Sequence, residues 1–406
     1  MKKLPGLVAL LLASTAFAAC GADDSGNGSD GGEITIGSVH PLTGGLAGVG
    51  GLMNNGAQLA VADINAAGGI KSLDGAKLKL ADGDSQGKAE VGQSEAQRLI
   101  SAGAVALIGT YQSDVTQNVA AVAERAKVPL VIDVAVDDAI LEQGYTNTFR
   151  IQPNATSMGA AGADALIAIG EANDAPVSSV SYIHIEGSFG QSVFDAFQAQ
   201  AESKGVKVAS EVTYAGSSFT DATTQVREAA SAKPDAIVVT GYYPDALLIA
   251  KAIGTLAPDI DAVYGVANGG FDDGSFPADA GANGEDILSA NYHYAATSDR
   301  AADIRKRFEA EYGKPMETAA MLSYQAVEIV AEALENAKSD DPTKVRTAIA
   351  DLELKDPLLA FDGPIAFDET GQNKNATVIV MQIQDGKVEQ VFPDEIKTAD
   401  LVYPTQ

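Results

Sequence analysis

The sequence predicts an α/β protein with two domains, each built on a mostly parallel sheet that helices cover on both faces. Three observations predict it. Short β-branched runs alternate with segments of helical periodicity, which is typical of right-handed βαβ crossovers. About 370 residues follow the N-terminal segment, more than one hydrophobic core normally accommodates. The composition, 46% hydrophobic and 20% charged, is typical of compact globular proteins.

The first series of strands and helices begins at residue 33. Gly68-Gly69 ends its first helix, since glycine is common just past a helix end, and Pro129 precedes its last strand. The predicted elements are strand 34–39, helix 53–67, strand 78–81, helix 89–101, strand 105–108, helix 114–126 and strand 130–132.

A second series follows Phe149-Arg150 and predicts the second domain. Its elements are helix 156–169, strand 180–185, helix 192–204, strand 206–212, helix 221–230, strand 236–240, helix 245–253 and strand 262–264. Helices then dominate, at 301–312, 319–337 and 342–350, before strand patterns return at 365–367, 376–384 and 387–391. The late strands indicate that the chain passes between the two domains more than once.

The N-terminal segment predicts export and attachment to a membrane. Met-Lys-Lys, an apolar stretch over 7–17 and two alanines before Cys20 predict a signal peptide over residues 1–19. The stretch is shorter than the roughly 20 residues that a membrane-spanning helix needs. Its end resembles the lipobox of bacterial lipoproteins, which predicts a lipid on Cys20; an ordinary signal peptide with a chance cysteine is the alternative. Residues 20–32, rich in Gly, Ser and Asp, then form a flexible tether.

Charge and residue usage exclude several functions. The chain has 55 acidic and 27 basic residues, a formal net charge of −28, which disfavours nucleic acid and anionic lipid as partners. None of the three histidines, His40, His184 and His293, has a second His or Cys at metal-ligand spacing. We therefore expect these histidines to make structural hydrogen bonds, and we expect the protein to bind no metal or cofactor. No Gly-x-Ser-x-Gly segment carries a plausible catalytic triad. We therefore expect a binding protein, not an enzyme, and no disulfide, because Cys20 is the only cysteine.

Ligands of open parallel sheets bind beyond the carboxyl ends of the strands, so the loops after the strands are the candidate sites. The glycine-rich segment 44–51 lacks the lysine of a phosphate loop; a helix N-terminus that binds a ligand carboxylate and a flexible turn both remain possible. The pairs Asp137-Asp138 and Asp272-Asp273 adjoin helix starts. One acid of each pair is expected to cap a helix, which leaves the other free to face a cleft.

A series of short segments, in this order and spacing, resembles the branched-chain amino-acid-type (leucine/isoleucine/valine-binding-like) solute-binding proteins of ATP-binding-cassette importers, which have the type I periplasmic-binding fold. Each segment is weak evidence alone. They are Ile34–Gly37, Pro41–Gly44, Asn55–Ala60, Asp63–Ile70, Ile108-Gly109, Gly144-Tyr145, Phe149-Arg150, Gly187–Gly190, Lys233–Ala236, Gly241–Pro244 and Phe367–Gly371.

The resemblance implies two lobes joined by three hinge crossovers, with lobe 1 at 33–149 and 268–360, lobe 2 at 150–267 and 361–393, and a C-terminal tail at 394–406. It implies the extracytoplasmic substrate-binding component of an importer, a monomer anchored by lipid that closes over a small polar metabolite, an amino acid or amide, and docks on a membrane permease. A ligand-sensing subunit of a signalling receptor, with no transport role, is the alternative.

The resemblance also assigns binding residues in lobe 1. Ser113, with Gln112, matches the loop that holds an amino acid's carboxylate through hydroxyl and backbone N–H donors. Ala135 and either Val136 or Asp137 match the neighbouring loop, which supplies backbone groups. The hydroxyl-bearing residue that amino-acid binders often place in that loop is missing.

In lobe 2, Phe189 and Tyr242 match the aromatic pair that covers the ligand, with core packing as the alternative. Ala267 stands where amino-acid binders usually present an acid to the ligand's ammonium. A buried ammonium without a partner costs several kcal/mol, so its partner must lie elsewhere or the ligand must lack it. Asp137 is one candidate partner, and Asn268 is suited to a neutral amide or a hydroxylated ligand.

Overall fold

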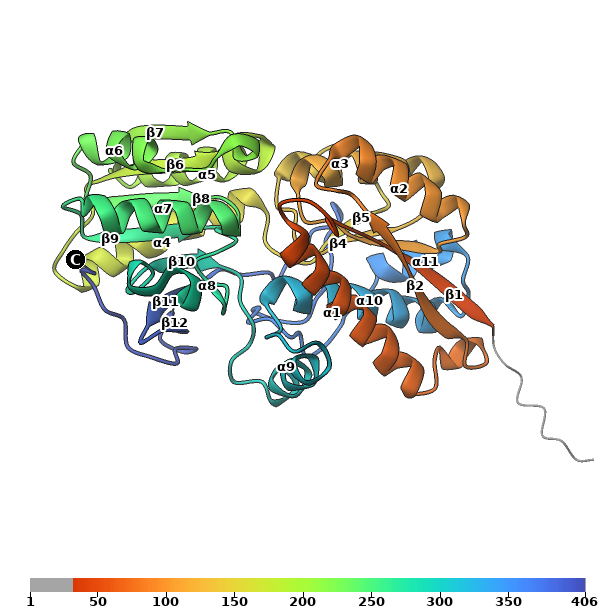
Figure 1. The fold of residues 1–406 in the computed structure, drawn as a ribbon. Helices are drawn as coiled ribbons and strands as arrows, with labels where there is room; N and C mark the ends of the chain where they lie inside the picture. Colours follow the sequence, from red (N-terminus) through yellow and green to blue (C-terminus); the bar gives the residue numbers. More distant parts are fainter. Residues whose placement is uncertain (1–31, 406) are drawn as a thin grey trace, which may run out of the picture.

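The structure is a computed structural model that describes residues 32–405, and it consists of two lobes, each built on one sheet (Figure 1). The predicted signal peptide, the lipidation of Cys20 and the tether up to residue 31 lie outside the described residues. Within the described part of the chain, no helix combines the length and the apolar character needed to cross a membrane.

The first lobe contains a five-stranded sheet in the order β2-β1-β3-β4-β5, with every neighbouring pair parallel. The two strands β3 and β4 are buried along their whole length and apolar, because helices cover both faces of the sheet. The strands are β1 (Glu33–His40), β2 (Lys77–Asp84), β3 (Ala106–Gly109), β4 (Leu130–Ile132) and β5 (Thr148–Arg150).

The second lobe contains a seven-stranded sheet in the order β12-β11-β10-β9-β8-β6-β7. Strands β6 to β10 are parallel, and β11 and β12 add to one edge in antiparallel fashion. The strands are β6 (Ser179–Ile185), β7 (Lys207–Tyr214), β8 (Ala236–Thr240), β9 (Ala262–Val266), β10 (Leu288–Asn291), β11 (Ile379–Gln384) and β12 (Lys387–Phe392).

Helices from both ends of the chain cover the first sheet, whereas those from its middle cover the second (Figure 1). Helix α10 packs along α1, and α11 and α9 pack against this pair. The first-lobe helices are α1 (Ala47–Ala66), α2 (Ala89–Ser101), α3 (Ser113–Ala126), α9 (Asp299–Tyr312), α10 (Thr318–Ala337) and α11 (Pro342–Ala350). The second-lobe helices are α4 (Ala155–Ala172), α5 (Ser188–Ser203), α6 (Thr223–Ser231), α7 (Tyr243–Leu256) and α8 (Phe276–Ala280).

Sheet membership shifts two of the predicted lobe limits. The chain enters the second lobe between β5 and α4, close to the predicted position. Strand β10 belongs to the second sheet, so the return to the first lobe comes between β10 and α9, not at residue 268. The segment before β11 still pairs with the first lobe through a bridge between Arg150 and Gln372, so the third crossing follows Gln372 and not residue 360.

Several elements differ from the sequence-based expectation. Helix α1 begins at Ala47, so the second half of the glycine-rich segment is helical; a Cβ atom on Gly50 would lie 2.1 Å from the Pro41 carbonyl oxygen, and glycine allows this close approach. Strand β10 and the short helix α8 were not predicted. Residues 365–367, predicted as a strand, form only isolated bridges to Leu354 and Asn373.

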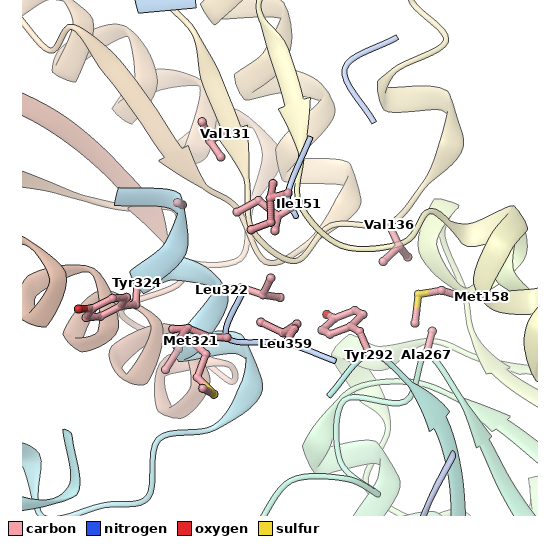
Figure 2. Close-up of a cluster of buried hydrophobic side chains, with 14 of the residues drawn as sticks. Val131, Val136, Ile151, Met158, Ala267, Tyr292, Met321, Leu322, Tyr324 and Leu359 are labelled. Atoms are coloured by element: carbon pink, nitrogen blue, oxygen red, sulfur yellow. The ribbon is translucent and has the colours of Figure 1, made fainter. Parts of the chain in front are cut away.

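The hydrophobic core is continuous from the first sheet to the second. Its largest cluster contains buried side chains of β1 and β3 together with those of β6 and β9. Figure 2 shows the part of this cluster where the lobes meet, with Val136, Met158, Ala267 and Tyr292 close together at one end. The apolar surface at the lobe junction is therefore provided by Val136, Ala267 and Tyr292, which follow strands of both sheets, and by Met158 of α4.

Two of the crossovers lie side by side at the hinge. The Arg150 backbone N–H donates to the Gly371 carbonyl oxygen at 2.8 Å, and the Asn373 N–H donates to the Arg150 carbonyl oxygen at 2.9 Å. The Arg150 guanidinium is buried and donates to the Asp137 carbonyl oxygen and to Gln372 Oε1, each at 2.7 Å. Because burial disfavours the charged form, the pKa of Arg150 falls to about 10, so the side chain remains a cation at neutral pH.

Replacing Gly371 with alanine is expected to lower the free energy of unfolding by about 2 kcal/mol, measured by denaturant titration. Gly371 has a φ of 87°, and a Cβ atom there would lie 2.2 Å from the Thr148 carbonyl oxygen. Gly386→Ala is the matched control, because φ is 73° at Gly386 but no atom lies within 4 Å of the added Cβ. Equal losses in the two variants would show that the close approach at the hinge contributes nothing.

Candidate functional site

A cleft between the two lobes lies at the carboxyl ends of the strands of both sheets. Most of its walls come from the segments that follow β3, β4, β6, β8, β9 and β10, as expected for parallel sheets, and Val49 of α1, Met158 of α4 and residues 317–319 at the start of α10 complete them. The space between the atoms of the cleft is about 700 Å³, a figure that includes open solvent at its mouth. Its walls are mainly apolar and aromatic with a few polar groups, which is typical of sites for small molecules.

The first lobe contributes Ser113 to the cleft. Ser113 is the first residue of α3, so its backbone N–H and those of the next two residues have no carbonyl acceptor within the helix. Its hydroxyl oxygen lies 3.4 Å from the Asp137 backbone N–H, from which it accepts. A helix N-terminus with a hydroxyl beside it is suited to a carboxylate.

Ala135 and Val136 also line the cleft, in the loop after β4. The Ala135 N–H donates to the Thr110 carbonyl oxygen at 3.2 Å, and its carbonyl oxygen accepts from Gln152 Nε2 at 2.8 Å. The Val136 carbonyl oxygen accepts from the Ala155 N–H at 2.8 Å. These three backbone groups are thus engaged within the protein, and the two residues contribute mainly apolar surface.

Aromatic rings from both lobes close one side of the cleft, and we call Phe189, Tyr242 and Tyr111 the aromatic stack. Phe189 and Tyr242, both from the second lobe, stack with ring centroids 5.3 Å apart and an interplanar angle of 23°. Tyr111, from the first lobe, lies 5.4 Å from the Tyr242 ring centroid. Beside the stack, the Ser188 hydroxyl of the second lobe donates to Asp114 Oδ1 of the first at 2.8 Å. The lobes therefore touch at this end of the cleft.

Three acidic side chains also line the cleft, and we call Asp272, Asp273 and Glu317 the carboxylate cluster. Asp272 and Asp273 follow β9 in the second lobe, whereas Glu317 is the N-cap residue of α10 in the first. Asp273 Oδ1 accepts from the Ser275 N–H at 2.8 Å, in the turn before α8. The N-cap residue of α8 is Ser275 and the helix has no side-chain cap, so the capping role predicted for one acid of this pair is wrong. Glu317 Oε2 accepts from the Gly274 N–H at 2.9 Å, across the lobe boundary.

The carboxylate cluster is electrostatically unfavourable by itself. Burial raises the pKa of Asp272 to about 7, although an Asn291 hydrogen bond opposes the shift. Burial raises the pKa of Asp273, and burial together with the charge of Asp273 raises the pKa of Glu317. The residues that line the cleft, all within 32–405, include no Lys, Arg or His. Burial thus favours the neutral forms of these carboxyl groups, and a positive charge bound beside them would favour their ionised forms.

Three residues predicted for the site do not line this cleft. Gln112 donates from its side chain to the Gly87 carbonyl oxygen at 3.3 Å. The carboxylate of Asp137 accepts from the Ala139 N–H at 3.1 Å and from Gln117 Nε2 at 2.6 Å. Asn268 is buried, and its side-chain oxygen accepts from the N–H groups of the two residues after Gly269. All three hold neighbouring loops in place.

Ser113, Ala135, Val136, Phe189, Tyr242 and Ala267 do line the cleft. Sequence reasoning missed Tyr111, Tyr292 and Glu317. Tyr111 lies in the loop after β3 that had been singled out, so an aromatic residue beside Gln112 was an available signal. Glu317 offered no such signal, because only the packing of α10 brings it opposite the loop after β9.

Ser38, His40 and Asp133 of the first lobe are hydrogen-bonded in the order of a catalytic triad, but a substrate cannot reach them. His40 Nε2 lies 2.7 Å from Asp133 Oδ2, and His40 Nδ1 lies 2.9 Å from the Ser38 hydroxyl. All three residues are buried, and the Ser38 hydroxyl donates to Asn54 Oδ1 at 3.0 Å. Because these residues are buried, a substrate has no path to them. The network instead ties β1, β4 and α1 together.

Two lobes that enclose a ligand-sized cleft at facing sheet edges define a clamshell solute-binding protein. The sequence over residues 33–387 matches the family described as periplasmic binding protein, and the chain belongs to this family. It is 30% identical over 403 residues to Leu/Ile/Val-binding protein homolog 8 of Brucella suis biovar 1 (strain 1330), a match that covers 96% of this chain and 95% of the relative.

Solved structures agree on the fold. One is the branched-chain amino acid transporter substrate binding protein LivJ from Streptococcus pneumoniae, in complex with isoleucine. It is 23% identical to this chain, with a TM-score of 0.76, and the match covers 92% of this chain and 100% of the LivJ chain. A solute binding protein of an ABC transporter from R. palustris, in complex with benzoate, is 20% identical to this chain, with a TM-score of 0.78. The match covers 91% of this chain and 97% of the R. palustris chain. The predicted family and the type I periplasmic-binding fold are confirmed.

The family consists of solute-binding proteins and not of enzymes, as the sequence analysis predicted. Its periplasmic character agrees with the predicted extracytoplasmic location. The two structures above carry chemically different ligands in the same fold, one an aliphatic amino acid and the other an aromatic acid. Ligand class in this fold therefore has to be argued from the side chains of the cleft.

Proposed function

We propose that this protein is the substrate-binding component of an ATP-binding-cassette importer and binds a small metabolite of amino-acid type between its lobes. The observation that carries the proposal is that one cleft combines a carboxylate-binding helix N-terminus at Ser113 with acids that attract an ammonium group. An amino acid presents both charges within a few ångströms of each other. The branched-chain amino-acid binders among the relatives support the same class.

Binding works by hinge closure in this proposal. Ser113 and Glu317 belong to the first lobe, and Phe189, Tyr242, Ala267 and Asp272 to the second, so a ligand that contacts both groups favours the closed arrangement. The closed surface is what a membrane permease recognises, and the protein acts as a monomer. The apolar side chains at the lobe junction, among them Met158 and Tyr292, exclude water from the bound ligand.

A thermal-shift screen of the purified protein with amino acids, amides and polyols tests this function. A ligand present at about 100 times its dissociation constant adds about 2.7 kcal/mol of stability, which raises the melting temperature by several degrees. Stabilisation by at least one amino acid is expected. Stabilisation by polyols alone would contradict the proposed ligand class, and unchanged uptake of the stabilising compound after deletion of the gene would contradict the transport role.

We also propose that lipid on Cys20 anchors the protein, with residues 21–32 as a tether of about 20 Å r.m.s. length. Cys20→Ala is expected to move the protein from the membrane fraction to the soluble fraction, because Cys20 is the only thiol that can carry the lipid. The measurement is fractionation of cells that express each form, with the wild-type protein as control. A variant that remains with the membrane would contradict the anchor.

A further inference from the structure

The carboxylate cluster contains more carboxyl groups than one ammonium group requires. Asp272 and Asp273 face the cleft from the second lobe and Glu317 from the first, so closing the lobes brings these acids together, and their ionised forms repel one another. One carboxylate suffices for the α-ammonium of a neutral amino acid. The two others then remain in the cleft without a basic partner among its lining residues.

Glu317 has an acceptor that the protein does not use. Its side chain is 9% exposed, and it lines the cleft. Oε2 accepts from the Gly274 N–H, whereas Oε1 is buried and has no hydrogen-bond partner among residues 32–405. A buried carboxylate oxygen without a donor is costly, so this atom marks a position where a ligand donor fits.

Arg305 is a basic side chain whose charge acts on Glu317, but it does not line the cleft. Its guanidinium lies over the Tyr294 ring, 3.8 Å from the centroid, and its charge only partly offsets the burial of Glu317. A metal ion is the other cation to consider. No group of three or more His, Cys, Asp or Glu side chains within residues 32–405 is arranged to hold one. The remaining candidate is an organic cation.

The other walls of the cleft suit an organic cation with an alkyl stem. Val136, Met158 and Ala267 form an apolar surface where the lobes meet, near the Tyr292 ring (Figure 2). The aromatic stack adds further ring faces. Alkyl stems pack on such apolar surface, and ring faces attract ammonium and guanidinium groups.

We propose that the ligand carries a basic side-chain nitrogen, an alkylammonium or a guanidinium, that binds between Glu317 and Asp272 and gives the ligand a net positive charge at neutral pH. This inference rests on the proposed function and narrows it to cationic amines. The cationic group bridges the carboxylates of the two lobes, and it thereby removes the repulsion that opposes closure. Basic amino acids and short diamines share this chemistry.

Isothermal titration calorimetry with pairs of cations and their neutral or less charged isosteres tests the proposal. The pairs are L-lysine with L-norleucine, L-arginine with L-citrulline, and 1,5-diaminopentane with 1-aminopentane. In at least one pair the more cationic member is expected to bind at least tenfold more tightly. Tight binding of lysine or arginine but not of the diamine identifies an amino acid. The reverse identifies a diamine, which keeps the cationic class but overturns the amino-acid type of the proposed function. If no pair shows this preference, the proposal is overturned.

The variant Glu317→Gln tests whether Glu317 is responsible for the preference for the more cationic member of each pair. Glutamine keeps a carbonyl oxygen that can accept from Gly274, so the variant loses charge with little change of shape. The preference for the cation is expected to fall at least tenfold, and Asp272→Asn is a second variant with the same expectation. An unchanged preference in both variants overturns the assignment to this cluster.

Tyr242→Ala separates this inference from the proposed function. It is expected to weaken both members of a pair by a similar factor, because the aromatic stack covers any ligand in the cleft. Neutral amino acids that bind and are weakened by Tyr242→Ala would leave the proposed function intact and overturn only the cationic class. Binding that Tyr242→Ala does not affect would place the ligand outside the cleft and overturn both.

Discussion

Replacing Arg150 with methionine is expected to lower the free energy of unfolding by about 3 kcal/mol. The guanidinium is buried at the hinge and donates to the Asp137 carbonyl oxygen and to Gln372 Oε1. Methionine retains the apolar stem but leaves both acceptors buried without these donors, and each unsatisfied acceptor costs about 1–3 kcal/mol. Gln372 belongs to the third crossover, so the loss should also loosen the packing between the two adjacent crossovers.

The measurement for Arg150→Met is urea or guanidinium unfolding of the variant and of a matched control, Arg227→Met. Arg227 is exposed on α6, so the same substitution there is expected to change stability by no more than about 0.5 kcal/mol. Equal stability of the two variants would show that the guanidinium at the hinge contributes no more than an exposed one. The account of how the crossovers are held together would then be wrong.

Tyr242→Ala is expected to weaken ligand binding at least a hundredfold, or about 2.7 kcal/mol. The Tyr242 ring contacts Phe189 within its own lobe and Tyr111 of the other lobe. Its removal therefore takes away one wall of the cleft and also a contact that favours closure. Buried aromatic residues at the centre of a contact surface commonly have effects of this size.

Calorimetric titration of Tyr242→Ala, with the compound that stabilises the wild-type protein most, provides the test. Tyr243→Ala is the matched control, because the Tyr243 side chain is absent from the cleft and its hydroxyl instead donates to Asp279 Oδ2 at 2.6 Å. The control is expected to keep its affinity within a factor of about three. Wild-type affinity in Tyr242→Ala would remove the aromatic stack from the binding site.

Most of the fold could be predicted from the sequence because buried parallel strands leave clear apolar runs. Helix α2 and strand β4 begin and end at the predicted residues. Strand β10 was missed because its four residues, Leu288–Asn291, include serine and asparagine and contain no β-branched residue. Residues 365–367 have strand-like composition, but they pair with short neighbouring segments of the hinge instead of joining a sheet.

The candidate site could be predicted only in part. Phe189 and Tyr242 directly follow strands, and the rule that ligands bind at carboxyl strand ends places them in a cleft. Asp137 was a reasonable candidate for the ammonium partner, but local capping at the start of a short 3₁₀ turn occupies its carboxylate. Asp272 and Asp273 lie only five and six residues after Ala267, so the loop that lacks an acid at that position still brings two acids to the cleft.

A crystal structure of the protein with a bound amino acid or diamine tests the central claim most directly. The account predicts ligand density between Ser113 on one side and Tyr242 on the other, in contact with both lobes and with a basic nitrogen beside Glu317. The chain also has a surface depression lined by Phe149, Arg346 and Lys374, close to the hinge. Ligand density at that depression, or density that touches only one lobe, would contradict the account.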